Sequence, residues 1–106
     1  MLTYKIVLPK ADNNGKNFNN KTFSKLLAEA QRLGIEGGSL YKPTTDFIGF
    51  WYNEQGKLYQ ENNGFLEVSG SIAIKPAMRK LAEYAKKLFK QEAIYFSIVK
   101  AEVNFI

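Results

Sequence analysis

The stretch that decides the fold runs from Lys75 to Phe105 and reads KPAMRKLAEYAKKLFKQEAIYFSIVKAEVNF. Over its first half, apolar residues recur every three or four positions, which is the spacing of a helix with one buried face. Pro76 suits the first turn of this helix, because the N–H that proline lacks has no helical partner there. From Ala93 to Val99 the chain is apolar and rich in β-branched and aromatic residues, which indicates a strand. The expected buried stripe of the helix is Ile74, Met78, Leu81, Ala82, Ala85, Leu88 and Phe89.

The last predicted strand continues from Lys100 to Phe105 with a period of two. Its alternating apolar residues indicate one buried face in this part. Between Ala93 and Val99, however, both faces are apolar. Such a strand usually lies in the centre of a sheet or in a subunit interface. We therefore expect one of these two places for it.

The start of the chain predicts a strand followed by a loop. Apolar residues occupy every second position from Leu2 to Leu8, which indicates a strand with one buried face. Pro9 ends this strand, since proline cannot donate a hydrogen bond to a neighbouring strand. Residues 11–20 are polar and rich in Asn and Gly, and this composition predicts a loop.

A second amphipathic helix is expected after the loop. It begins at Asn20 or Lys21, with Asn20 as the N-cap and Thr22 as the other choice. Gly34 stands where a helix commonly ends in a left-handed residue. The helical spacing predicts a buried stripe made of Phe23, Leu26, Leu27, Ala30 and Leu33.

The middle of the chain predicts an antiparallel hairpin or meander. Phe47 to Tyr52 reads as a strand, and the turn 53–56 leads to a returning strand from Lys57 to Glu61. Residues 62–64 are a further turn or a bulge, so that Phe65 to Val68 is either a new strand or an extension of the same one. Ser39 to Lys42 is a short candidate strand, and the sequence leaves open whether it joins the sheet.

The order of these elements predicts one α+β domain over residues 1–106, with a ferredoxin-like split β-α-β layout. In this layout two helices cover one face of an antiparallel sheet. The other face would expose residues such as Val7, Tyr95 and Val99, and exposed apolar side chains on a sheet usually mark an interface. We therefore expect a homodimer through the open sheet face. The other hypothesis is a monomer in which the loop 11–20 covers that face.

Composition excludes several kinds of chemistry. The chain has neither Cys nor His, so a disulfide, a thiolate zinc site and a Ser-His-Asp triad are impossible. The net charge of +5 favours anionic partners such as nucleic acid or an acidic protein surface, although a solvated basic surface is the commoner use of such charge. We see no signal peptide or membrane span and expect a cytoplasmic protein that needs no cofactor or metal.

One part of the sequence resembles a small uncharacterised bacterial family, a domain of unknown function. Members carry a Gly-x-Trp strand, an Asp-Gly type of turn and a strand that ends in Glu. The matching residues here are Gly49-Phe50-Trp51, Gln55-Gly56-Lys57-Leu58 and Glu61.

The same family has a helix that runs into Phe-x-Gln-Glu-Ser-Val, where this chain has Phe89-Lys90-Gln91-Glu92-Ala93-Ile94. The resemblance covers roughly residues 49–95, and the chain departs from the pattern at Gln55 and Ala93. It implies a layout like that of ferredoxin-like or dimeric α/β-barrel proteins, and it implies no activity.

Two sets of residues are candidates for a site. The first is the basic face of the helix that begins near Lys75, together with the end of that helix, which could follow phosphates or meet acidic groups. It comprises Lys75, Arg79, Lys86, Lys87 and Lys90. The second is a cavity between helices and sheet. It would be lined by Trp51, Tyr95, Gln91 and Glu92.

In that cavity, burial of Glu92 would raise its pKa toward the range that suits proton transfer. A structural role for the pair is the commoner alternative: Gln91 would cap the helix, and Glu92 would accept loop hydrogen bonds or pair with a Lys. Phe50 and Tyr52 should lie on one face of their strand and Trp51 on the other, so the aromatic residues cannot all share one pocket.

Two functions remain open on this basis. The leading hypothesis is a small non-catalytic binding module for an acidic protein surface or nucleic acid, of a compact size that is common on mobile elements. The alternative is a protein like the dimeric α/β-barrels, which binds or transforms a small organic molecule in a cavity. The second rests on analogy between folds.

Overall fold

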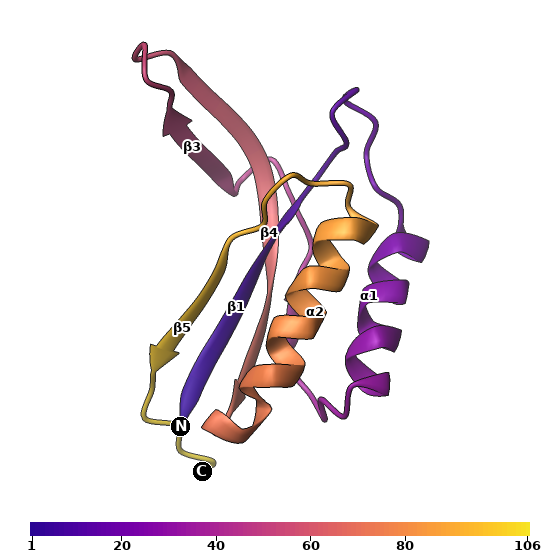
Figure 1. Ribbon diagram of the computed structural model, residues 1–106, viewed down its shortest axis with the longest axis vertical. Coiled ribbons are helices and arrows are strands. Elements are labelled where there is room, and N and C mark those ends of the chain that lie inside the picture. Colours follow the sequence, from indigo (N-terminus) through magenta and orange to yellow (C-terminus); the bar gives the residue numbers. More distant parts are fainter.

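The computed structural model describes residues 1–106 and places two helices on one face of an antiparallel sheet (Figure 1). This arrangement confirms the predicted α+β fold. The elements are β1 (Leu2–Pro9), α1 (Asn20–Arg32), β2 (Ser39–Tyr41), β3 (Ile48–Tyr52), β4 (Leu58–Gly70), a 3-10 turn (Ile72–Ile74), α2 (Lys75–Leu88) and β5 (Phe96–Lys100).

The sheet has the strand order β2-β4-β1-β5, and β3 pairs with the outer part of β4. All pairs are antiparallel, and β2 joins the sheet by pairing with β4. The expected central place of the last strand is wrong: β5 pairs with β1 alone and lies at the edge. It also ends at Lys100, so the predicted extension to Phe105 is not a strand.

β4 is one continuous strand of 13 residues, so residues 62–64 form neither a turn nor a break. Its second half pairs with β1, whereas its first half pairs only with β3. The hairpin made of β3, the turn 53–57 and residues 58–61 of β4 therefore stands beyond the sheet, and we call it the arm (Figure 1). Gly56, with a φ of 79°, provides the left-handed residue of its turn.

The core lies between the sheet and the helices. Tyr4, Ile6 and Leu8 of β1 are fully buried, as their alternation predicts. On β4, Leu66 and Val68 lie next to these β1 residues and also face the helices. Burial of apolar area at about 25 cal/mol per Å² is the main force that holds these layers together. The helices add Phe23, Leu26, Ala30, Met78, Leu81, Ala82, Ala85 and Phe89 to this core.

Helix α1 differs from the prediction in two places. Its N-cap is Asn19 and not Asn20, because the Oδ1 atom of Asn19 accepts a 3.2 Å hydrogen bond from the Thr22 N–H. Leu27 is 44% exposed, since it lies at the margin of the helix face that meets the sheet. Gly34 follows the last turn with a φ of 83°, as expected.

The end of α2 anchors the loop that follows β1. The buried ring of Phe89 contacts Phe18 edge-on at a centroid distance of 4.9 Å and Phe23 at 5.3 Å. Because Phe18 packs on the helix side, this anchor does not support the alternative in which the loop covers the open face of the sheet. No helix in the structure has the length and apolar character that crossing a membrane requires.

Candidate functional site

The open face of the sheet exposes apolar side chains. By strand alternation Val7, Phe65, Tyr95 and Val99 point away from the helices. Tyr95 is 66% and Val99 59% exposed. The predicted open face is therefore present, with the residues expected on it.

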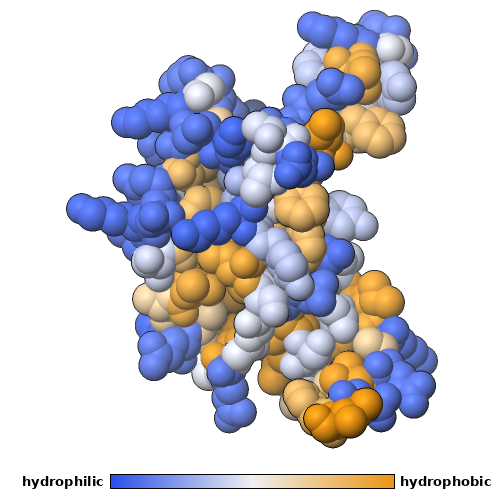
Figure 2. All heavy atoms as spheres, turned by 180° about the vertical axis from the view of Figure 1, so that it is seen from behind, coloured by the Kyte–Doolittle hydropathy of each residue, from blue (hydrophilic) through white to orange (hydrophobic).

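The arm carries large apolar residues on both of its faces. Phe50 and Tyr52 lie on one face, and Trp51 lies on the other, where its ring stacks on Tyr59 at 5.4 Å. This confirms the predicted alternation. Figure 2 shows the arm standing away from the body with hydrophobic residues on its surface. A two-stranded hairpin is marginally stable by itself in water. Exposed apolar surface on both of its faces is, in addition, typical of a segment that another surface covers.

Two hollows meet at Glu61, at the base of the arm. The larger, of about 260 Å³, is lined by Lys10, Ala11, Asp12, Asn17, Glu61 and Asn62. The smaller, of about 70 Å³, is lined by Val7, Pro9, Glu61, Gln91, Ala93, Ile94 and Tyr95. We call the two together the Glu61 site. Polar groups from β1 and its loop, from β4 and from the segment after α2 converge here.

Backbone hydrogen bonds hold the Lys10 side of the site in place. The Lys10 N–H donates to the Asn62 carbonyl at 3.1 Å, which ties the loop to β4. The Oδ1 atom of Asp12 accepts hydrogen bonds from the N–H groups of Asn14 and Lys16, both at 2.9 Å. The loop is therefore a fixed turn, and Lys10 is presented to the hollow beside Glu61.

Glu61 is an unpaired carboxylate with a perturbed pKa. It forms no ion pair and accepts no side-chain hydrogen bond in the structure. Glu61 is an exposed residue, yet neighbouring atoms remove part of the water around its carboxylate, and this partial desolvation raises the pKa of Glu61. An unpaired carboxyl group with a raised pKa beside a hollow is typical of a functional site.

Gly49 leaves room on the β3 side for a side chain of β4. It lies directly opposite Glu61 in the β3–β4 pair. A Cβ atom at this position would overlap the side-chain amide of Asn63 and approach the Cγ atom of Glu61 to 3.9 Å. The absence of a side chain at Gly49 therefore leaves room for the amide of Asn63, whereas Glu61 would be only in ordinary contact with the added atom.

The structure brings together only part of the predicted cavity. Gln91 and Tyr95 line the smaller hollow, whereas Trp51 lies on the arm outside both hollows. Glu92 is exposed and forms no hydrogen bond or ion pair, so its expected burial is wrong. The predicted cap is confirmed: the Gln91 amide donates to the Phe89 carbonyl at 2.8 Å.

Sequence reasoning missed Glu61 as a site residue. The signal was a run of polar residues, Gln60 to Asn63, inside a segment with strand character. We expected this run to form the end of one strand and a turn. In the continuous strand β4, Glu61 instead lines both hollows, and Asn62 lines the larger one.

The predicted basic residues of α2 do not form one face. Lys75, Arg79 and Lys86 are spaced by four and seven residues and therefore share one side of the helix. Lys87 points about 100° away from Lys86 around the helix axis, and Lys90 lies beyond the helix end with a φ of 54°. Arg79 and Lys86 border a hollow of about 270 Å³ beside β5, whose other lining residues are Ala82, Glu83, Ala93, Ile94 and Phe96.

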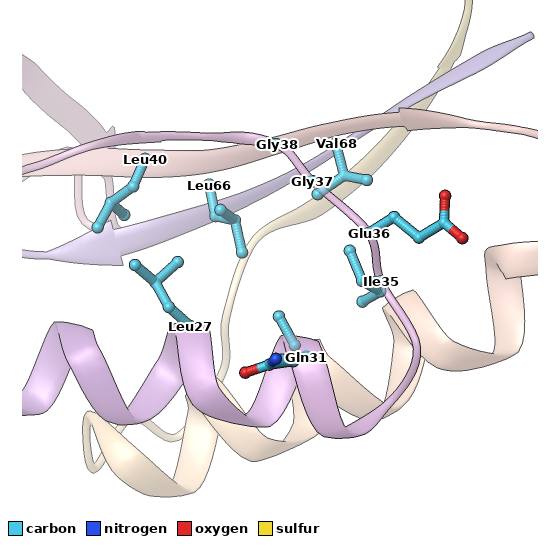
Figure 3. A pocket seen from close by; sticks show the side chains of 10 residues that line it. Leu27, Gln31, Ile35, Glu36, Gly37, Gly38, Leu40, Leu66 and Val68 are labelled. Carbon is cyan, nitrogen blue, oxygen red and sulfur yellow. The ribbon is translucent and has the colours of Figure 1, made fainter.

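A further hollow, of about 330 Å³, lies between α1, the segment after it and the sheet (Figure 3). Leu27, Ile35, Leu40, Leu66 and Val68 give it an apolar lining. Figure 3 shows the carboxylate of Glu36 turned away from these side chains. With few polar groups to orient a ligand, this hollow is a weaker candidate than the Glu61 site.

No family model and no curated protein matches the sequence. Solved structures are similar in fold. A phage SAM lyase in complex with S-methyl-5'-thioadenosine superimposes with a TM-score of 0.68 at 17% identity, over 92% of this chain and 78% of that chain. CutA1 from Oryza sativa gives a TM-score of 0.67 at 8% identity, over 98% of this chain and 82% of the other.

A DUF3240 family protein from Shewanella baltica gives a TM-score of 0.51 at 9% identity, over 99% of this chain and 94% of the other. At these identities the similarity concerns the fold alone. The motif resemblance over residues 49–95 has no matching family model behind it. The chain shares the ferredoxin-like α+β fold of small proteins of the CutA1 and DUF3240 kinds.

Proposed function

We propose that this chain binds a small sulfonium or thioether of adenosine in the Glu61 site, and that S-adenosylmethionine is a substrate that it cleaves. The observation that carries the proposal is the unpaired carboxyl group of Glu61, with its raised pKa, at the junction of two hollows. The proposal develops the small-molecule hypothesis from the sequence but moves the site from the interior to the base of the arm.

The chemistry of the lining fits such a ligand. S-adenosylmethionine carries a sulfonium, an ammonium and a carboxylate, and the larger hollow offers the carboxylate of Glu61 and the ammonium of Lys10 for these charges. Tyr95 borders the smaller hollow and is 66% exposed, so its ring is available for an adenine to stack on. The side-chain amides at the site are donors and acceptors for ribose hydroxyls and the adenine edge; they belong to Asn17, Asn62 and Gln91.

The similarity to the phage SAM lyase supports the choice of ligand. That protein was solved with S-methyl-5'-thioadenosine and superimposes over 92% of this chain. A likeness of fold at 17% identity does not transfer an activity. It does name a ligand class whose charges agree with those at the Glu61 site, and this agreement arises from residues of this chain.

A binding experiment tests the proposal. Calorimetric titration should show binding of S-adenosylmethionine and of S-methyl-5'-thioadenosine, and chromatography of the first mixture should show release of the second compound with time. Glu61→Gln should weaken binding of the cationic ligand at least about tenfold, because it removes a charge-assisted contact in a partly desolvated site. Glu54→Gln makes the same chemical change near the turn of the arm and should have no effect.

Absence of binding of both compounds at millimolar concentration would refute the proposal. An equal loss of affinity in Glu61→Gln and Glu54→Gln would show that the Glu61 site is not where the ligand binds. Circular dichroism of both variants verifies that they are folded.

A homodimer through the open sheet face is part of the proposal. The exposed Val99 and the apolar faces of the arm support it, because a second copy would remove them from water. Native mass spectrometry of the gently purified protein would give the mass of the assembly and of any retained small molecule. A bare monomer would contradict this part.

The binding-module hypothesis remains as a second proposal, since it concerns a different surface. The observation that favours it is the alignment of Lys75, Arg79 and Lys86 along the side of α2 that borders the hollow next to β5. Such a stripe suits an acidic macromolecular partner. Glu substitutions at Arg79 and Lys86 should abolish partner binding and leave the Glu61 site unchanged.

A further inference from the structure

We infer that the groove between α2 and β5 binds an extended acidic peptide, which adds to the sheet as a further strand beside β5. The inference rests on the second proposal, whose partner and mode of binding it names. It does not involve Glu61, although Ala93 and Ile94 line both the groove and the smaller hollow of the Glu61 site. Three observations carry it: a free strand edge, a stripe of cations above that edge, and an apolar hollow between the two.

The outer edge of β5 has unpaired backbone groups. The Val7 N–H donates to the Tyr95 carbonyl, and the Ala101 N–H donates to the Met1 carbonyl, both at 3.0 Å. Hydrogen-bonded and non-hydrogen-bonded positions alternate in an antiparallel pair. The backbone N–H and C=O groups of the odd-numbered residues from Tyr95 to Ala101 therefore point to β1. The N–H and C=O groups of the even-numbered residues therefore point outward, and these residues are Phe96, Ile98 and Lys100.

Such an edge is a template for a peptide strand. Main-chain hydrogen bonds to the edge supply affinity, and pockets for alternate side chains supply specificity. The five residues from Phe96 to Lys100 are enough for a short added strand. Soluble proteins usually protect an edge of this kind with a bulge, a proline or a covering segment, and no element covers β5 on this side.

Charge selects an acidic peptide. Arg79 and Lys86 line the hollow, and Lys75 continues the same side of α2 toward the start of the helix. Lys100 pairs with Leu2 and by alternation points to the helix side of the sheet. Side chains of an added strand that point to the helix side would thus lie below a row of cations, where carboxylates are favoured.

The hollow itself selects one apolar side chain. Its volume of about 270 Å³ and its apolar lining by Ala82, Ile94 and Phe96 would accept a group such as valine, leucine or phenylalanine. Ile98, next along the strand on the same side, is 36% exposed and would gain cover from the peptide. Burial of apolar area at about 25 cal/mol per Å² would add to the main-chain bonds.

Glu83 makes nucleic acid the poorer occupant. It lies between Arg79 and Lys86 in the lining of the hollow and is 3.9 Å from Arg79. An evenly charged phosphate backbone would meet this carboxylate, whereas a peptide can place an uncharged residue there. A strand edge also offers N–H and C=O groups in alternation, which match another peptide backbone and not a sugar–phosphate chain.

The test is fluorescence anisotropy of the full chain with a labelled heptapeptide in which aspartate and glutamate alternate with valine and leucine. We expect saturable binding. The double variant Arg79→Glu plus Lys86→Glu should weaken it at least about tenfold, because like charges then face each other. Lys87→Glu is the matched control, since it makes the same charge change on another side of the helix, and it should change the affinity less than about twofold. Glu83→Gln should tighten binding.

Two further probes identify the mode of binding. A peptide with N-methyl groups at alternate backbone positions should not bind, because it cannot complete the strand pairing. In hydrogen exchange followed by NMR, the heptapeptide should slow the amides of Phe96, Ile98 and Lys100 and leave those of the arm unchanged.

Several results would overturn the inference. One is the absence of heptapeptide binding at millimolar concentration, and another is a loss of affinity in Lys87→Glu equal to that in the double variant. A third is full protection of the three β5 amides without peptide, which would mean that the edge is already paired in the assembly. Binding of a single-stranded oligonucleotide with loss of the peptide signal would assign the stripe to nucleic acid instead. Binding of S-adenosylmethionine should be the same in all α2 variants, so the two proposals can fail separately.

Discussion

Phe89→Ala should cost about 4 kcal/mol of unfolding free energy. The Phe89 side chain is fully buried and contacts the rings of Phe18 and Phe23. Truncation of a buried Phe to Ala typically costs about 3–5 kcal/mol, and each aromatic contact contributes about 0.5–1.5 kcal/mol within that loss. A domain of this size has a total stability of about 5–15 kcal/mol, so the variant should fold but unfold at a much lower urea concentration.

Equilibrium urea denaturation followed by circular dichroism measures this loss. Leu88→Ala is the matched control, because Leu88 is the adjacent residue and only half-buried; it should cost about half as much. In Phe89→Ala, hydrogen exchange should also be accelerated relative to the wild type more in the loop 10–18 than in the arm, since Phe18 anchors that loop on Phe89. A loss below about 1.5 kcal/mol would refute the packing described for the end of α2.

Three further predictions concern the cap, the sheet and the site. Asn19→Ala should destabilise the protein by about 1 kcal/mol in thermal unfolding, and Asn20→Ala by clearly less, because Asn19 holds the Thr22 N–H. Gly64→Ala should lower stability by more than about 2 kcal/mol, since the new Cβ would overlap the backbone of Tyr41 and Pro43; a small loss would show that β2 is not fixed on β4. Glu61→Gln should leave the unfolding free energy at pH 7 unchanged or raise it by up to about 0.5 kcal/mol. The reason is that the pKa of Glu61 is raised in the folded state, so the wild type loses stability as the pH rises through that pKa. A Gln variant that is less stable than the wild type at pH 7 would contradict the partial desolvation of Glu61.

The hydrophobic periodicity of the sequence and the positions of its Gly and Pro residues predicted most of the fold. The alternation in β1, the helical stripe of α2 and the roles of Gly34 and Pro76 were all confirmed. The predictions that failed depended on tertiary context. The apolar run around Ile98 indicates burial, but the strand order places β5 at the edge, and nothing local in the sequence encodes which strand lies beside it.

The candidate site was harder to predict for a related reason. Asn62, Asn63 and Gly64 are residues with turn preference, yet β4 continues through them because β1 and β3 provide partners on successive parts of the strand. Pairing of this kind overrides local propensity. Glu61 therefore lies at the base of the arm and not at the expected end of a strand. The residues that line the hollows with it come from residues 10–17 and 91–95, which are distant in sequence.

The measurement that tests the central claim most directly is an NMR titration of the Glu61 side-chain carboxyl group, recorded with and without S-adenosylmethionine. In the free protein the pKa should lie above the usual range of Glu, because partial burial disfavours the charged form. The cationic ligand should lower this pKa, and by linkage its affinity should fall as pH decreases through the pKa of Glu61. A midpoint in the usual range that does not respond to S-adenosylmethionine would contradict the assignment of Glu61 as the ligand-binding carboxylate.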